Sequence, residues 1–297
     1  MAKFGEPLIK AHEYILSKQI SWALNQGITL IGSKGQRGRA TYASTLEQNL
    51  FEPLEPEVRK NFERGDGNEI NGNPDSPSKM QAVHSSSAMG VNIFQHWQKI
   101  GQVPEIAAAC GFCRKDNNIS QKIVFEDKYP IDKERFRFPP NIDVVFHNSD
   151  LVKVKRFAVE CKFSEAYSSH GHSGLKEEYL KLKSIWDDIP SLHRLAISIC
   201  PDDKKFLHVQ PAQLIKHILG LKTHFGKEGF RLLYFWYDVL GEEGATHEKE
   251  ISTFTERARA DGIKFHAVSV QELIIALSKA YRSDHPEYIQ YISGRYL

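Results

Sequence analysis

Long apolar runs are absent from this sequence of 297 residues, and no segment approaches the length that a helix needs to cross a membrane. Residues 1–5 lack the apolar region of a secretory signal, so we expect no signal peptide. Cysteine is scarce as well, since only Cys110, Cys113, Cys161 and Cys200 are present. These absences argue against a membrane protein or a disulfide-stabilised secreted domain and predict a protein of the reducing cytoplasm.

An excess of charge of one sign is also missing. The chain holds 39 Lys and Arg against 37 Asp and Glu, which gives a formal net charge of +2. The composition therefore does not by itself indicate a nucleic-acid-binding protein, and any DNA-binding surface would have to be a local cluster of cations. Hydrophobic residues make up 41% of the chain, which is ample for a core, and charged residues an ordinary 26%. The length fits one large domain or two small ones.

Hydrophobic periodicity divides the chain into two parts. Apolar residues at helical spacing in the first part predict helices at residues 7–26, 43–50, 56–62 and 87–100. The second part predicts strands at residues 119–126, 142–146, 157–163, 195–200, 231–239 and 264–270. These strands alternate with predicted helices at residues 174–188, 211–219, 248–260 and 270–281. The alternation of strands and helices predicts an α/β fold.

Two of the predicted strands carry charged residues where a core strand should be apolar. Asp143 lies in one of them, and Glu160 and Lys162 lie in the next. Side chains alternate along a strand, so Glu160 and Lys162 share a face and Cys161 points to the other. Burying a carboxylate is costly unless it is paired or bound to a metal. The two strands therefore predict a divalent metal site.

The two strands can be aligned by counting residues. If they pair antiparallel and Asp143 faces Glu160, the centre of the hairpin falls between Leu151 and Val152. The connecting loop then covers about residues 147–156 and is polar and basic, which suits an exposed tip. The nearest turn signal, an Asn-Ser-Asp sequence, lies before this centre, so the sequence leaves the register open.

The chemistry of these residues fits hydrolysis of a phosphodiester. Carboxylate oxygens suit Mg²⁺ or Mn²⁺, which keep bound waters and bind phosphate oxygens. Such a cation stabilises charge on the phosphate and lowers the pKa of an attacking water. A lysine beside it can orient or deprotonate that water and offset the charge of the pentacovalent phosphorane.

Ile142-Asp143 followed by Glu160-Cys161-Lys162 resembles the motif of the PD-(D/E)xK nuclease superfamily, the fold of many restriction endonucleases. The usual proline directly precedes the aspartate, whereas here Pro140 stands three positions before Asp143. Further segments resemble a group of bacterial restriction-endonuclease-like proteins within that superfamily, namely residues 65–70, 84–94 and 160–165. The resemblance covers approximately residues 50–200.

The resemblance implies a restriction-endonuclease-like core at residues 81–297, with a central mixed β-sheet flanked by helices. A helical N-terminal extension at residues 1–80 would pack on this core within one compact unit. Asp143 and Glu160 are implied ligands of Mg²⁺ or Mn²⁺, with the backbone carbonyl of Cys161 as a third ligand. Lys162 would position or activate water. The expected function is metal-dependent endonucleolytic hydrolysis of DNA in restriction or defence, with a homodimer left open and with no membrane or organic cofactor.

Four other polar residues are candidates for a functional role, and each could instead be an ordinary structural or solvated side chain. Glu126 ends a predicted strand and is either a further metal-site carboxylate or an exposed charge at the strand end. Glu165 stands where the resembled family often has an acid, although it could equally cap a loop. Asn92 recurs in the resembled motif and could meet the active site from its predicted helix. Glu69 lies in a loop rich in Gly, Asn, Pro and Ser, where a solvated side chain is the default.

Two clusters of cations are candidates for DNA binding. One is a glycine-rich loop with Lys34, Arg37 and Arg39, and the other is the predicted hairpin loop. The hairpin loop holds Lys153, Lys155 and Arg156, at the far end of the strands from the acids. A solvated loop is the alternative for each cluster.

Two other functions stay open on the sequence alone. A non-catalytic nucleic-acid-binding protein could keep the nuclease fold, although the intact Asp, Glu and Lys set argues against it. The same site could also serve an exonuclease or an RNA-cleaving enzyme.

Overall fold

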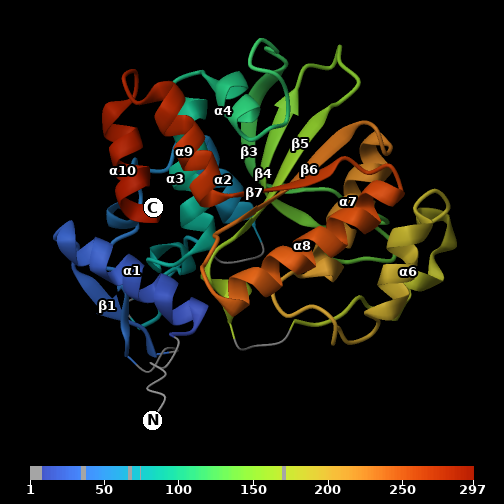
Figure 1. Ribbon diagram of the computed structural model, residues 1–297, viewed down its shortest axis with the longest axis horizontal. Helices are drawn as coiled ribbons and strands as arrows, with labels where there is room; N and C mark the ends of the chain where they lie inside the picture. Colours follow the sequence, from blue (N-terminus) through green and yellow to red (C-terminus); the bar gives the residue numbers. More distant parts are fainter. Residues whose placement is uncertain (1–8, 35–37, 66–68, 74, 169–171) are drawn as a thin grey trace, which may run out of the picture.

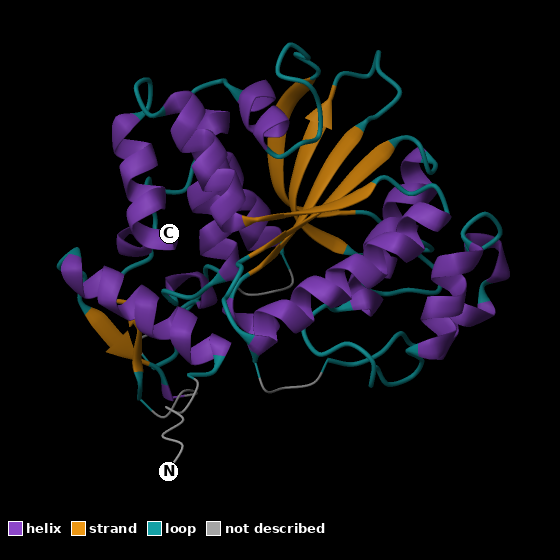
Figure 2. Ribbon diagram, viewed as in Figure 1, coloured by secondary structure: helices purple, strands orange, loops and turns teal. Residues whose placement is uncertain are grey.

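A five-stranded mixed β-sheet lies at the centre of the protein (Figure 2). The computed structural model describes residues 9–34, 38–65, 69–73, 75–168 and 172–297. The strands follow the order β3 (Ser120–Lys128), β4 (Asn141–Asn148), β5 (Arg156–Lys162), β6 (Phe230–Trp236) and β7 (Phe265–Ser269). The pairs β3–β4 and β4–β5 are antiparallel, whereas β5–β6 and β6–β7 are parallel. This sheet and its flanking helices confirm the predicted α/β fold with a central mixed sheet.

Helices cover both faces of the sheet (Figure 1). The core on one face takes residues from α1 (Ala11–Asn25), α2 (Pro56–Arg64), α3 (Ser86–Lys99), α4 (Val103–Ala109), α9 (Val270–Tyr281) and α10 (Pro286–Tyr296). The core on the other face takes residues from α5 (Glu177–Lys181), α6 (Pro190–Ser198), α7 (Pro211–Phe225) and α8 (Glu242–Ala260). The sheet is therefore the middle of three layers.

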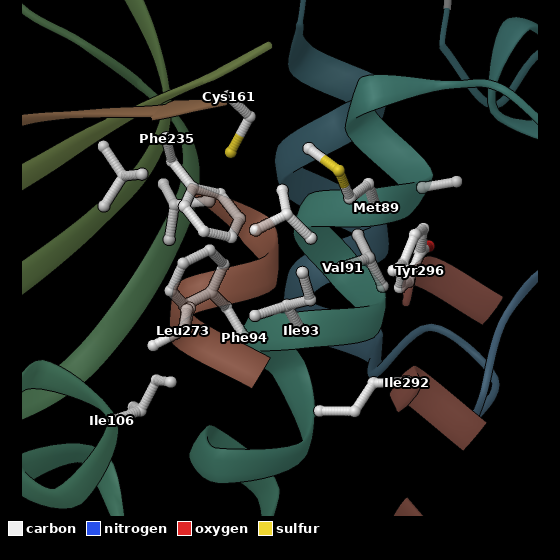
Figure 3. Packing of buried hydrophobic residues seen from close by; sticks show 14 of the residues in the cluster. Met89, Val91, Ile93, Phe94, Ile106, Cys161, Phe235, Leu273, Ile292 and Tyr296 are labelled. Atoms are coloured by element: carbon white, nitrogen blue, oxygen red, sulfur yellow. The ribbon is translucent and has the colours of Figure 1, made fainter. Parts of the chain in front are cut away.

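Alternation along β5 sends its side chains to different layers. Phe157, Val159 and Cys161 lie in the core on the α3 side. Figure 3 shows Cys161 of β5 and Phe235 of β6 reaching toward α3, where Phe94 meets the Phe235 ring at 5.7 Å between centroids. Burying an aromatic ring in this way stabilises the fold by about 1.5–3 kcal/mol. Because this face of β5 is apolar, the charged residues of β5 must point to the α7 side.

The hairpin between β4 and β5 has the register that the acids predict. Val144 pairs with Val159, and His147 pairs with Arg156. Continuing this register places residue 143 opposite residue 160 and centres the hairpin between residues 151 and 152. The structure therefore settles the register that the sequence leaves open.

The residues before α3 contain more than the predicted helices. β1 (Leu30–Gly32) and β2 (Ala40–Ala43) form a separate two-stranded antiparallel sheet that the sequence analysis does not predict. The predicted helix at residues 43–50 is reduced to a 3₁₀ turn, η2 (Glu47–Asn49). The N-terminal part is therefore a mixed α and β structure rather than a helical extension.

The strand predicted at residues 195–200 is wrong, because these residues continue α6. Leu195 and Ala196 are buried while Ile197 and Ser198 are exposed, which is the period of a helix. The helix predicted at residues 174–188 is also broken, into α5 and a 3₁₀ turn, η5 (Lys183–Ile185). Helices α4 and α10 are additional elements. Across the described residues, no helix combines the length and apolar character needed to span a bilayer.

Candidate functional site

The charged residues of β4 and β5 meet at the end of the hairpin opposite its loop. The Lys162 ammonium donates a hydrogen bond to Glu160 Oε1 at 2.6 Å, and both side chains are almost fully buried. Asp143 Oδ2 accepts a hydrogen bond from the backbone N–H of Cys161 at 2.7 Å. The structure thus brings together the three residues that the sequence singles out.

Two residues of α7 complete this arrangement. Lys162 donates a second hydrogen bond to Gln213 Oε1 at 2.9 Å. His217 Nε2 lies 2.7 Å from Glu160 Oε2, and the other ring nitrogen of His217 is buried with no hydrogen-bond partner among the described residues. Gln213 and His217 are four residues apart, so they lie on one face of the helix. Neither residue could be identified from the sequence, because the sequence of a helix does not show which strand the helix covers.

Glu160 and Lys162 form an ionised pair. Burial by itself would raise the pKa of Glu160, but the charges of Lys162 and His217 lower it to about 2. Burial would also lower the pKa of Lys162, but Glu160, Glu165 and Asp143 raise it above its ordinary value. Lys162 therefore keeps its proton at neutral pH.

The pKa values of Asp143 and Glu126 shift upward, in the opposite direction to the pKa of Glu160. Burial, followed by the charge of Glu160, raises the pKa of Asp143 well above its usual range. Burial, followed by the charge of Glu69, raises the pKa of Glu126 to about 7. These carboxyl groups repel one another, so they hold protons when no cation balances them.

Glu126 reaches this cluster through an unusual backbone conformation. Its φ is +55°, and no other non-glycine residue has a positive φ in the part of the chain that the structure describes. Such a conformation costs on the order of 1–3 kcal/mol, so the surroundings must hold it. Asn141 donates a hydrogen bond from Nδ2 to Glu126 Oε2. On the loop side, the Ser87 hydroxyl donates to Glu69 Oε2 at 3.0 Å. Glu126 and Glu69 thus join the acids at this end of the sheet.

Glu165 lies beside the site, whereas Asn92 does not. Burial raises the pKa of Glu165, and the Lys162 ammonium opposes that shift from nearby. Asn92 accepts a hydrogen bond from the backbone N–H of Phe51 at 2.6 Å and donates one to the Tyr296 hydroxyl at 3.2 Å. Asn92 therefore ties α3 to its neighbours and is not brought to the acids.

Comparison with known protein families adds an independent finding. A family model described as "Restriction Endonuclease associating with ARP" matches residues 17–297. The chain belongs to this restriction endonuclease family. Comparisons with curated proteins and with solved structures give no match. Membership of the family confirms the predicted restriction-endonuclease-like nature of the chain, and a restriction endonuclease family implies a DNA substrate.

In this family member, the basic residues of the hairpin loop are engaged within the protein. Lys153 forms an ion pair with Glu228. Lys155 Nζ donates to the backbone carbonyl of Asp150 at 2.6 Å. The Arg156 guanidinium lies 4.9 Å from the centroid of the Phe225 ring. These contacts account for all three side chains without DNA.

The basic loop near the N-terminus is similar. Lys34 forms an ion pair with Asp75 at 2.9 Å, and both side chains are largely exposed. Arg39 binds both carboxylate oxygens of Glu13 at 2.9 and 3.2 Å. Arg37 lies outside the described residues. The described cations of both clusters therefore have contacts within the protein, and Lys34, Arg39 and Lys153 are paired with carboxylates.

The end of the β4–β5 hairpin where the carboxylates meet, opposite its loop, is called the acid end below. Its donor set suits a hard divalent cation by charge and by ligand type. Carboxylates are the ligands that Mg²⁺ and Mn²⁺ prefer, and burial together with neighbouring carboxylates raises the pKa values of Asp143 and Glu126. Within the described ranges, no three His, Cys, Asp or Glu side chains are already arranged to hold a metal ion. Cation binding would therefore need main-chain oxygen and a shift of the carboxylates.

Proposed function

We propose that this chain is a metal-dependent endonuclease of the PD-(D/E)xK type that hydrolyses phosphodiester bonds of DNA. The observation that carries the proposal is the convergence of Asp143, Glu160 and Lys162 at one end of a single hairpin. Lys162 Nζ lies 2.6 Å from Glu160 Oε1, and Asp143 Oδ2 lies 2.7 Å from the backbone nitrogen of Cys161, the residue between them in β5. Membership of a restriction endonuclease family supports the same conclusion.

Asp143 and Glu160, together with the carbonyl oxygen of Cys161, would hold Mg²⁺ or Mn²⁺. When bound, such a cation supplies charge stabilisation on the phosphate and lowers the pKa of a water molecule. Glu126 stands next to these ligands with a pKa of about 7, so it can take up or release a proton at neutral pH.

The residues around Lys162 limit the chemical roles that its ammonium can take. Its raised pKa keeps the ammonium charged, so it is a poor general base. It can orient a water molecule by donating a hydrogen bond, and it can offset charge that develops on the phosphorane. Gln213 and Glu160 fix the direction of the ammonium, since both accept hydrogen bonds from it.

The experiment is a cleavage assay on closed circular DNA, linear DNA and RNA with Mg²⁺, Mn²⁺ or EDTA. We expect the wild-type protein to cut circular DNA only with a divalent cation. Glu160→Gln and Asp143→Asn should each lower the rate on the order of 100- to 1,000-fold or more. Glu256→Gln is the matched control, because Glu256 is an exposed carboxylate on α8 away from these contacts.

The substrates separate the alternatives. Cutting of linear but not circular DNA would indicate an exonuclease, and a preference for RNA would indicate an RNA-cleaving enzyme. DNA binding without cleavage under every condition would favour the non-catalytic protein. Equal cleavage by the wild-type protein, Glu160→Gln and Asp143→Asn would exclude this site as the active site.

A further inference from the structure

The candidate site holds more carboxyl groups than cationic side chains. Glu69, Glu126, Asp143, Glu160 and Glu165 surround it, and Lys162 is already paired with Glu160. A phosphate is itself an anion, so a DNA strand needs further cations to approach this end of the sheet. The cations that the sequence suggests lie in other contacts, and Lys34, Arg39 and Lys153 are paired with carboxylates there.

One cation on α7 has the required position. Lys216 directly precedes His217, which contacts Glu160, and follows Gln213 by three residues. Residues three, four and seven apart share a helix face, so Lys216 stands on the flank of the face that touches the site. Gly220 follows on the same face, where an added Cβ would lie 2.5 Å from the Tyr129 carbonyl oxygen and 3.3 Å from the Pro140 side chain, in the connection between β3 and β4. Lys216 therefore stands on α7 between Gln213, which contacts Lys162, and Gly220, which packs against that connection.

Lys216 is also free to bind a ligand. It is half-buried, and in the described part of the chain no hydrogen bond or ion pair engages it. Burial, followed by the charge of Lys176, lowers the pKa of Lys216, while Glu160 opposes the shift. Lys176 is the second cation near Lys216, because its charge acts on the Lys216 ammonium, and its own exposed pair with Glu178 is loose at 3.8 Å. A half-buried unpaired ammonium beside another ammonium is costly unless an anion balances it.

We propose that Lys216, assisted by Lys176, binds a backbone phosphate of the DNA strand at the candidate site. This inference rests on the proposed nuclease function and names the group that receives its substrate. The recognised chemistry is a phosphodiester, since an ammonium binds phosphate oxygens as a point charge without reading the base sequence.

The test measures DNA affinity and its salt dependence for Lys216→Gln, Lys216→Arg and Lys222→Gln, on a DNA fragment that the wild-type protein cuts and with Ca²⁺ in place of Mg²⁺. Lys216→Gln should weaken binding about 10- to 100-fold and reduce the slope of log K against log salt by about 0.9. Lys216→Arg should restore most of both. Lys222 is the matched control on the same helix, because its ammonium is already paired with Asp188 at 2.5 Å.

A second measurement locates the phosphate that Lys216 contacts. Methylphosphonate replaces one charged phosphate by a neutral group, and it is placed at each position around the mapped cut. At one position, the replacement should weaken binding to the wild-type protein but not to Lys216→Gln. If no position shows this coupling, or if folded Lys216→Gln keeps the wild-type affinity and slope, the inference is wrong.

The two proposals fail in different ways. A wild-type protein that neither binds nor cuts DNA overturns both of them. A wild-type protein that cuts DNA at the Glu160-dependent site, with Lys216→Gln unaffected, overturns only the role of Lys216.

Discussion

The two ends of the β4–β5 hairpin differ in how their charged side chains are balanced. At the loop end, each cation has a contact that needs no ligand, such as the pair of Lys153 with Glu228. At the other end, carboxylates are crowded until Asp143 and Glu126 have raised pKa values. Satisfied charges stabilise or solubilise a fold, whereas uncompensated buried charges cost free energy and persist where a ligand balances them. The acid end is therefore where function is expected.

The largest effect should follow from removing the one cation within the acid end. Lys162→Met leaves Glu160 buried with only His217 as a partner. Breaking a buried pair on one side should lower the free energy of unfolding by about 3 kcal/mol, and cleavage should fall about 100-fold. Urea unfolding in EDTA and the cleavage assay measure the two effects.

The double variant Glu160→Gln/Lys162→Met is the control for this pair. It should regain part of the lost stability, because no uncompensated charge is left buried, but it should regain no activity. If Lys162→Met alone is as stable as the wild-type protein, then the pair does not hold the site together.

An effect of intermediate size is expected in how the stability of the metal-free protein depends on pH. A carboxyl group with a raised pKa contributes its stability fully below the unfolded-state pKa, and that contribution is lost as pH rises through the folded-state pKa. For Glu126 this window runs from its ordinary value of 4.5 to about 7, and for Asp143 it also begins near its ordinary value and extends upward. Stability in EDTA should therefore fall as pH rises from 5 to 8.

Asp143→Asn and Glu126→Gln should each flatten this fall, since an amide does not ionise. Asp150→Asn, at the exposed hairpin loop, should leave it unchanged. Urea unfolding at closely spaced pH values checks the slope. A decline of the same steepness in Asp143→Asn would show that repulsion at the acid end does not control the pH response.

The smallest effect should come from the loop end. Lys153 is exposed and its pair with Glu228 is solvated, so Lys153→Gln/Lys155→Gln should change stability by less than about 0.5 kcal/mol per pair. The salt dependence of DNA binding should also stay at the wild-type value, because both cations already have partners. A reduction of the slope by about 1 to 2 would show that this loop contacts DNA and that the contrast between the two ends is incomplete.

Much of the sheet could be predicted from local sequence. The alternation Phe157, Val159, Cys161 on one face of β5 requires Glu160 and Lys162 on the other. The turn signal leaves the register with β4 open, and the structure gives the one that pairs Val144 with Val159. The α6 region shows the limit of such reasoning. An apolar run as short as residues 195–200 fits a buried strand or a helix face, and only packing against the neighbouring helices decides for the helix.

The sequence alone determined the three charged residues of the hairpin, their common face and the α/β character of the chain, because period-two alternation is a local property. The tertiary structure decided which other residues stand beside them. The local sequence does not distinguish Gln213, Lys216 and His217 from other helix residues. Their place beside the site depends on the packing of α7 against β5. Glu126 becomes part of the acid cluster only through its positive φ and its approach to Glu69. Contacts between residues far apart in the chain depend on how layers pack, and no local pattern encodes that placement.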